Sequence, residues 1–164
     1  MKDALVVVAL ALVAIAVGAV LYTKNPAAPS APATIAGTPV SFSTLASGIE
    51  SSVKEPKNYL ITSEPGLQEL WQMINSQDPP PIIDFTKNSV IAIFAGAEPT
   101  AGYEIKVSAI ADSASRQVLI VLTKPGGSCI VPQIVTAPYE VVELPATALP
   151  LTHQQAVETT SCLQ

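Results

Sequence analysis

The chain has 164 residues, 49% of them hydrophobic, and a formal net charge of −5 at pH 7. This length allows a single domain. The acidic balance, with no cluster of Lys or Arg, argues against nucleic-acid binding. Much of the apolar excess lies in the first 25 residues, so the remainder has the composition of an ordinary soluble domain.

Residues 4–22 form an uncharged apolar run of sequence ALVVVALALVAIAVGAVLY. At 1.5 Å per helical residue, such a run just crosses a hydrocarbon core of about 30 Å. Tyr22 ends the run and Lys24 follows it, and both suit the membrane interface. We therefore predict a transmembrane anchor within residues 1–24. A cleaved signal peptide is the alternative, although the apolar run exceeds the usual 7–15 residues of such signals.

Residues 25–38 are rich in proline and alanine, a composition typical of an extended spacer rather than a packed segment. The folded domain is expected over residues 39–164. We predict a single-pass protein of the cell membrane with this domain on the extracytoplasmic side, or a secreted domain if the leader is cleaved. The pair of cysteines and the signal-like start favour the extracytoplasmic side.

The first part of the domain predicts two short strands and one helix. The strands are expected at residues 40–43 and 58–62. Ser63 can cap the helix that follows, and prolines 79–81 end it. Apolar residues at i, i+3, i+4 and i+7 give this helix one buried stripe, formed by Leu67, Leu70, Trp71 and Ile74.

The centre of the domain runs from Ser89 to Ile110. The continuous apolar run of residues 90–94 predicts a buried strand, and strict alternation from Tyr103 predicts a half-buried one. In that alternation Tyr103, Ile105, Val107 and Ala109 face the core, whereas Glu104, Lys106, Ser108 and Ile110 face the other side.

Further strands are expected at residues 118–123, 139–144 and 156–160, and at 129–131 and 133–135 on either side of Pro132. These elements predict a mainly-β (α+β) fold, an antiparallel β-sandwich-like domain with one packed helix, preceded by the transmembrane helix.

Cys129 and Cys162 are separated by 33 residues, which matches no zinc-ligand spacing. Outside the cytoplasm a disulfide is the favoured interpretation, with a stabilisation of about 3 kcal/mol, while two unrelated thiols remain the alternative. No metal site and no cofactor are predicted, because His153 is the sole histidine. It lies in a proline-flanked tail without a nucleophile motif, so we expect no enzyme activity.

Three loops combine glycine or proline with polar residues between strands, at residues 96–102, 124–128 and 136–139. Binding loops on a rigid β scaffold have this character. The alternative is that they are tight turns, with Tyr103 and Tyr139 in the core. The candidate binding residues are Glu98, Pro99, Thr100, Gly102, Tyr103, Gly126, Gly127, Pro138 and Tyr139.

The chain from Val40 onward resembles the C-terminal domain of the PrcB protease-complex subunit family. The resemblance rests on VSFSTLASGIESS, ITSEPGLQELW, IIDFTKNSVIAIFAGAEPTAGYEIKVSAI and PGGSCIVPQIVTAPYEVVELP, in that order. It implies a non-catalytic, exported accessory domain with a protein partner, and an extracytoplasmic protease is one candidate partner. The family's Pro-Thr-Gly-Gly-Tyr core has Ala101 at its third position here, so positive φ is not expected at that residue.

A second similarity is to chagasin-type cysteine-protease inhibitors. These immunoglobulin-like domains carry a Pro-Thr-Thr-Gly-Tyr loop, a glycine-rich loop and an Arg-Pro-aromatic loop, and the three loops of this chain occur in the same order. Ala101 and Ala137 stand where the inhibitors have threonine and arginine. The similarity implies an alternative function, protease inhibition through the 96–102, 124–128 and 136–139 loops.

Overall fold

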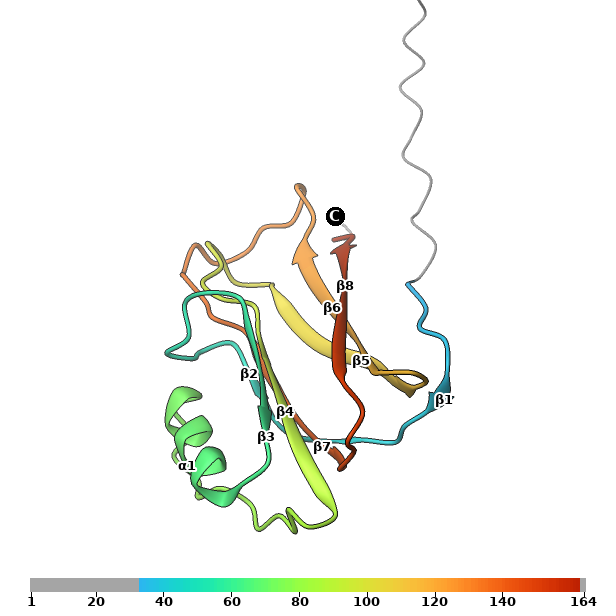
Figure 1. The fold of residues 1–164 in the computed structure, drawn as a ribbon. Helices are drawn as coiled ribbons and strands as arrows, with labels where there is room; N and C mark the ends of the chain where they lie inside the picture. Colours follow the sequence, from blue (N-terminus) through green and yellow to red (C-terminus); the bar gives the residue numbers. More distant parts are fainter. Residues whose placement is uncertain (1–32, 163–164) are drawn as a thin grey trace, which may run out of the picture. The chain divides into compact units, whose positions relative to one another are not determined.

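The computed structural model describes residues 33–162, which fold as two stacked β-sheets with one helix on the outer face of one of them (Figure 1). The predicted anchor at residues 4–22 lies outside the described residues. Within residues 33–162, no helix is both long and apolar enough to cross a bilayer.

Within residues 33–162, eight strands and one helix follow each other. They are β1 (Thr38–Pro39), β2 (Ser43–Gly48), β3 (Lys57–Ile61), α1 (Glu64–Met73), β4 (Asn88–Phe94), β5 (Glu104–Asp112), β6 (Arg116–Pro125), β7 (Tyr139–Pro145) and β8 (Leu151–Thr160). One sheet has the order β1-β5-β6-β8 and the other β2-β7-β4-β3. All pairings are antiparallel except that of β6 with β8, which is parallel. The predicted mainly-β sandwich with one packed helix is confirmed.

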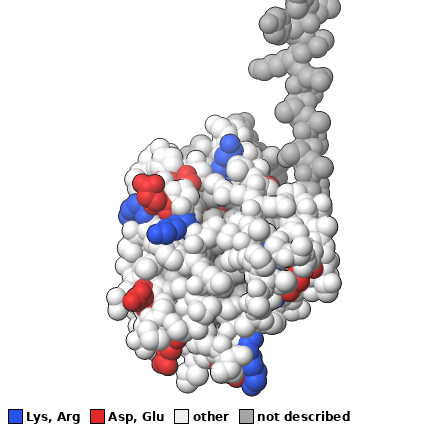
Figure 2. Space-filling model, in the orientation of Figure 1, with Lys and Arg blue, Asp and Glu red and all other residues white. Residues whose placement is uncertain are grey.

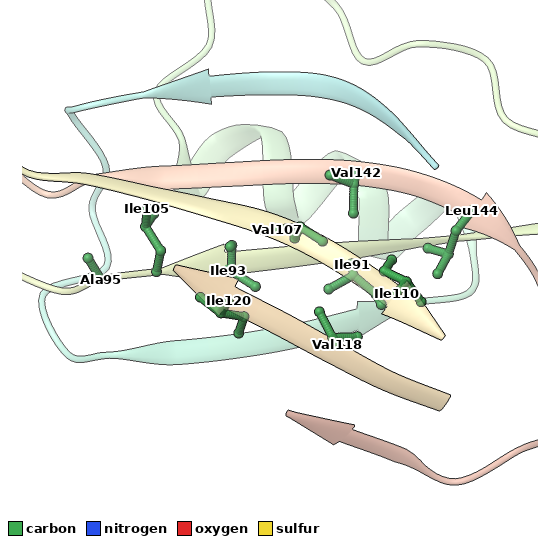
Figure 3. Close-up of a cluster of buried hydrophobic side chains, with 10 residues drawn as sticks. All are labelled: Ile91, Ile93, Ala95, Ile105, Val107, Ile110, Val118, Ile120, Val142 and Leu144. Carbon is green, nitrogen blue, oxygen red and sulfur yellow. The ribbon is translucent and has the colours of Figure 1, made fainter. Parts of the chain in front are cut away.

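Strand β4 is buried on both faces, which explains its unbroken apolar sequence. Ile91 and Ile93 point between the two sheets, whereas Val90, Ala92 and Phe94 point toward the helix. The first cluster fills the sandwich (Figure 3) and consists of Ile91, Ile93, Ala95, Ile105, Val107, Ile110, Val118, Ile120, Val142 and Leu144. The second joins the sheet to Leu67, Leu70, Trp71 and Ile74, the predicted stripe of the helix.

Helix α1 begins after Ser63, as predicted, although the serine side chain makes no capping hydrogen bond. The helix stops at Met73, several residues before the prolines expected to end it. Asn75 follows with a φ of 53°, a left-handed conformation in which the helix cannot continue.

The alternation predicted for β5 is wrong beyond Val107. The pairing of β5 with β6 shifts register between Val107 and Ala109, so Ser108 is an extra residue in the strand. An inserted residue reverses which side chains face inward. Ile110 is therefore buried, and Ala109 is only partly so.

Two other predictions at the end of the chain need correction. Residues 129–131 and 133–135 are not strands but parts of the long β6–β7 loop, because Pro132 and the neighbouring turn leave them outside both sheets. The last strand is longer than the predicted 156–160. Nearly all β8 side chains are exposed, so no apolar alternation marked its first half.

Candidate functional site

Loops from distant parts of the sequence meet at one end of the sandwich. Strands β4 and β7 pair side by side, as do β5 and β6, so the β4–β5 and β6–β7 connections leave the sheets together. We call this region the loop end and define it by residues 49–56, 95–103 and 126–138. Figure 1 shows these connections at the top of the ribbon.

Backbone hydrogen bonds fasten the β4–β5 loop to the β6–β7 loop. Glu98 N–H donates to Thr136 O at 2.8 Å, and Thr136 N–H donates back to Glu98 O at 3.0 Å. The Thr136 hydroxyl donates to Thr100 O at 3.0 Å. Ala101 N–H donates to Pro132 O at 3.0 Å. The two loops therefore form one continuous backbone surface.

A disulfide fixes the other part of the β6–β7 loop. Cys129 and Cys162 are bonded, with their Cα atoms 5.2 Å apart, so the predicted disulfide is confirmed. Cys129 N–H donates to Gly126 O at 2.9 Å, and Gly126 N–H donates to Thr160 O at 3.0 Å. The loop is thus attached at residues 126–129, at Pro132 and at Thr136.

Between these attachments the β6–β7 loop exposes apolar side chains. Ile130 is fully exposed, Val135 is 71% exposed and Ile134 is 54% exposed. Residues 125–139 contain no charged side chain. Charged groups are also sparse on the face shown in Figure 2, where uncharged atoms cover most of the surface. An apolar group held in water by an anchored backbone is typical of a contact surface.

Two ionisable groups at or beside the loop end have pKa values shifted by burial. Burial raises the pKa of Glu98 and likewise the pKa of the Tyr139 phenol. Both thiols are held in the disulfide.

The comparison with known proteins points to the same segment. Residues 89–145 match one family model, described as PrcB C-terminal. This is the family that the chain resembles. The match runs from β4 to β7 and so includes both fastened loops, and it supports a role as an accessory domain related to a protease complex. No curated protein and no solved structure matches the chain.

The candidate binding residues of the PrcB-like segment lie at different depths. Pro99, Gly102 and Gly127 are exposed, whereas Glu98, Thr100, Tyr103 and Gly126 are partly buried. Gly102 has a φ of 88°, which only glycine adopts readily, and Ala101 has no positive φ, as predicted.

The 136–139 loop turns inward instead of facing solvent. Ala137 and Pro138 are buried, and Tyr139 packs its ring 6.1 Å from that of Phe94. Ala95 N–H donates to Pro138 O at 2.9 Å, which fixes this turn against the end of β4. These residues support the exposed parts of the loop end from beneath.

Two parts of the loop end were not predicted. The β2–β3 loop joins it, because Ala97 N–H donates to Lys54 O at 3.0 Å and Ala137 N–H donates to Ile49 O at 2.7 Å. Ile130, Ile134 and Val135 were assigned to strands, so their exposure was missed. The sequence does contain a signal against strands here. Pro132 lies between two apolar pairs, residues 130–131 and 134–135, and neither pair alternates with polar residues.

His153 lies away from the loop end, on β8. It lines a hollow of about 450 Å³ between the sheets together with Asn58, Ile105 and Gln155, and burial lowers its pKa. Within the part of the chain that the structure describes, no group of three His, Cys, Asp or Glu residues could hold a metal ion.

Proposed function

We propose that this protein is a non-catalytic accessory module that binds a protein partner through the loop end. The proposal includes tethering by residues 4–22, with the domain on the extracytoplasmic side of the cell membrane. The observation that carries it is the uncharged β6–β7 loop, whose backbone is fastened at several points while Ile130, Ile134 and Val135 project into water.

The fastened backbone favours binding, because the loop needs little further ordering when a partner binds. Immobilising a flexible loop costs free energy that would be subtracted from the affinity. Burying an apolar side chain of this size contributes roughly 1.5–3 kcal/mol. Three such side chains on an anchored loop fit a recess of matching apolar character on the partner.

The PrcB match favours a component of an extracytoplasmic protease complex as that partner. An accessory module contacts the complex without performing its chemistry. Its contact surface therefore needs shape and apolar area rather than a catalytic group.

The inhibitor alternative has less support. Inhibition through three loops requires each of them to face the protease. Ala137 and Pro138 of the third loop are buried beneath the other two, and Ala137 has no side chain that could reach a partner.

The test is recovery of partners from membranes with the tagged full-length chain. The variant Ile130→Ser/Val135→Ser should lose a specific partner because both side chains are exposed and neither supports the core. The matched control is Ile82→Ser, since Ile82 is also fully exposed but lies between α1 and β4.

Identification of a protease-complex component that is recovered by wild type and Ile82→Ser, but not by the loop variant, would support the proposal. Equal recovery by all three chains would overturn the assignment to this loop. Titration of the full chain against papain-like and subtilisin-like proteases tests the alternative, and inhibition at about micromolar concentration would favour it.

Tethering is tested separately. Membrane fractionation followed by mass measurement of the purified chain should show residues 1–24 still attached. A mature chain lacking them, recovered from the medium, would replace the anchor with a cleaved signal.

A further inference from the structure

Among residues 33–162, strand β8 has a long edge without a paired strand, and this edge is distinct from the loop end. The strand pairs with β6 on one side and is the last strand of its sheet. The pairing runs without a register shift over ten residues, from Leu151 opposite Arg116 to Thr160 opposite Pro125. The other sheet edges are shorter, since β1 has 2 residues, β3 has 5, and β2 has 6 with a bulge.

The hydrogen bonds to β6 identify which backbone groups of β8 are free. Arg116 N–H donates to Pro150 O at 2.9 Å, and Gly126 N–H donates to Thr160 O at 3.0 Å. Even-numbered residues of β8 therefore face β6. Because backbone groups alternate in direction along a strand, the N–H and C=O groups facing the free edge belong to Leu151, His153, Gln155, Val157 and Thr159.

This edge lacks the features that usually prevent pairing with another strand. Proteins protect exposed edges with lysine, proline, bulges or covering segments. Residues 151–160 contain no lysine and no proline, and Glu158 is their sole charged residue. Val157 on β8 is half exposed. Leu60 on β3, an edge strand of the other sheet, is also half exposed.

We propose that β8 pairs antiparallel with β8 of a second copy of this chain, around a two-fold axis at Gln155. An axis perpendicular to the sheet keeps inner faces on the same side, so odd-numbered residues meet odd-numbered ones. Gln155 is the middle of the five residues with free backbone groups. The self-paired strands therefore exchange roughly ten hydrogen bonds and leave none of these groups unpaired.

The side chains in this register are compatible. His153 lies opposite the half-exposed Val157, and Glu158 lies opposite Thr152. The two Glu158 carboxylates are separated by about six residues along the strands, or roughly 20 Å, so they do not repel strongly.

A pair of cysteine variants of the full chain tests this register. In Gln155→Cys the two new cysteines are a directly opposed pair with Cα atoms about 5.5 Å apart, within disulfide range. In Gln154→Cys, the matched control, the equivalent atoms are roughly 8 Å apart, beyond that range. Mild oxidation should give at least about tenfold more covalent homodimer for Gln155→Cys than for the control.

Sedimentation at about 0.15 M salt, where repulsion between acidic copies is screened, supplies a second measurement. The wild-type chain should dimerise, and Gln155→Lys should weaken dimerisation at least about tenfold because two cations meet at the axis. Gln154→Lys should weaken it much less. Equal crosslinking of the two cysteine variants, or a monomeric wild type at about 100 μM, would overturn the proposal. So would crosslinking of Gln155→Cys to a different protein in cells, which would assign the edge to that protein's strand.

Discussion

The carboxylate of Glu140 links the two sheets, and its removal gives the most specific prediction for stability. Glu140 is 5% exposed on β7. Its Oε2 accepts the Val107 N–H at 2.6 Å, and its Oε1 accepts the Thr44 hydroxyl at 3.0 Å. Val107 borders the bulge of β5, where the regular ladder to β6 is interrupted. The side chain therefore supplies an acceptor that the neighbouring strand does not.

Glu140→Ala should lower the free energy of unfolding by about 2–4 kcal/mol. A buried donor without a partner costs about 1–3 kcal/mol, and the space left by the removed atoms adds to this. Glu140→Gln keeps one oxygen acceptor and should cost only about 1 kcal/mol. Thr44→Ala removes the other hydrogen bond at an exposed residue and should cost less than about 1 kcal/mol.

Urea unfolding followed by tryptophan fluorescence measures these differences. Trp71 is the only tryptophan and is buried between the helix and the sheet, so its emission reports loss of the second core cluster. The slope with denaturant should stay constant across the variants. If Glu140→Ala is as stable as Thr44→Ala, the carboxylate does not link the sheets in the way described.

Three further predictions use the same assay. Cys129→Ser/Cys162→Ser should lower the free energy of unfolding by about 3–4 kcal/mol, as loop closure over the separation of 33 residues implies. Reduction of the wild-type disulfide should have the same effect. If neither change lowers the free energy of unfolding, the disulfide does not stabilise the fold by restricting the unfolded chain. A hydrogen bond from Arg116 lowers the pKa of Asp112 in the folded state. The ionised carboxylate therefore stabilises the fold fully at pH values above the unfolded pKa of about 3.9. This stabilisation is lost as the pH falls through the lower pKa of the folded state. Asp112→Asn should therefore be less stable than wild type at neutral pH and converge with it in acid, whereas a constant difference would refute the linkage. Gly96→Ala should cost at least about 1 kcal/mol, because φ is +85° and a Cβ would lie 2.9 Å from the Pro56 ring; a neutral effect would show that the backbone relaxes.

The elements that could be predicted are those whose burial follows their own sequence. The continuous apolar run of β4 predicts a buried strand, and the spacing of apolar residues in α1 predicts a helix with one buried stripe. Both side-chain patterns lie within a few neighbouring residues, and both elements are buried as predicted. Strand β8 gave a weak signal, since its side chains are exposed and its main interaction is the backbone ladder to β6.

The links between distant elements could not be predicted. The Arg116 guanidinium is 4% exposed, and it bonds Asp112 at 2.7 Å and the carbonyl of Pro145. The sequence places this arginine in a polar turn, and nothing in it indicates a contact with a carbonyl 29 residues away. Glu140 was likewise hidden within an apolar strand, because its main partner is a backbone group at a bulge.

The loop end was predicted in part. Glycine and proline marked the loops, but their meeting depends on the pairing of β4 with β7 and of β5 with β6, which one sequence does not specify. The apolar side chains of residues 130–135 suggested strands for the same reason that they now suggest a contact surface. Composition alone does not distinguish a buried apolar residue from an exposed one.

The parallel pairing of β8 with β6 has a practical consequence for labelling. β8 runs toward the loop end, and two residues after it Cys162 is bonded to Cys129 of the β6–β7 loop. A fluorescent protein or affinity tag fused directly after Cys162 would therefore lie near the β6–β7 loop and would compete with a partner for space. The turn at residues 113–115 between β5 and β6 lies at the opposite end of the sandwich, and a small epitope inserted there would leave the β6–β7 loop accessible.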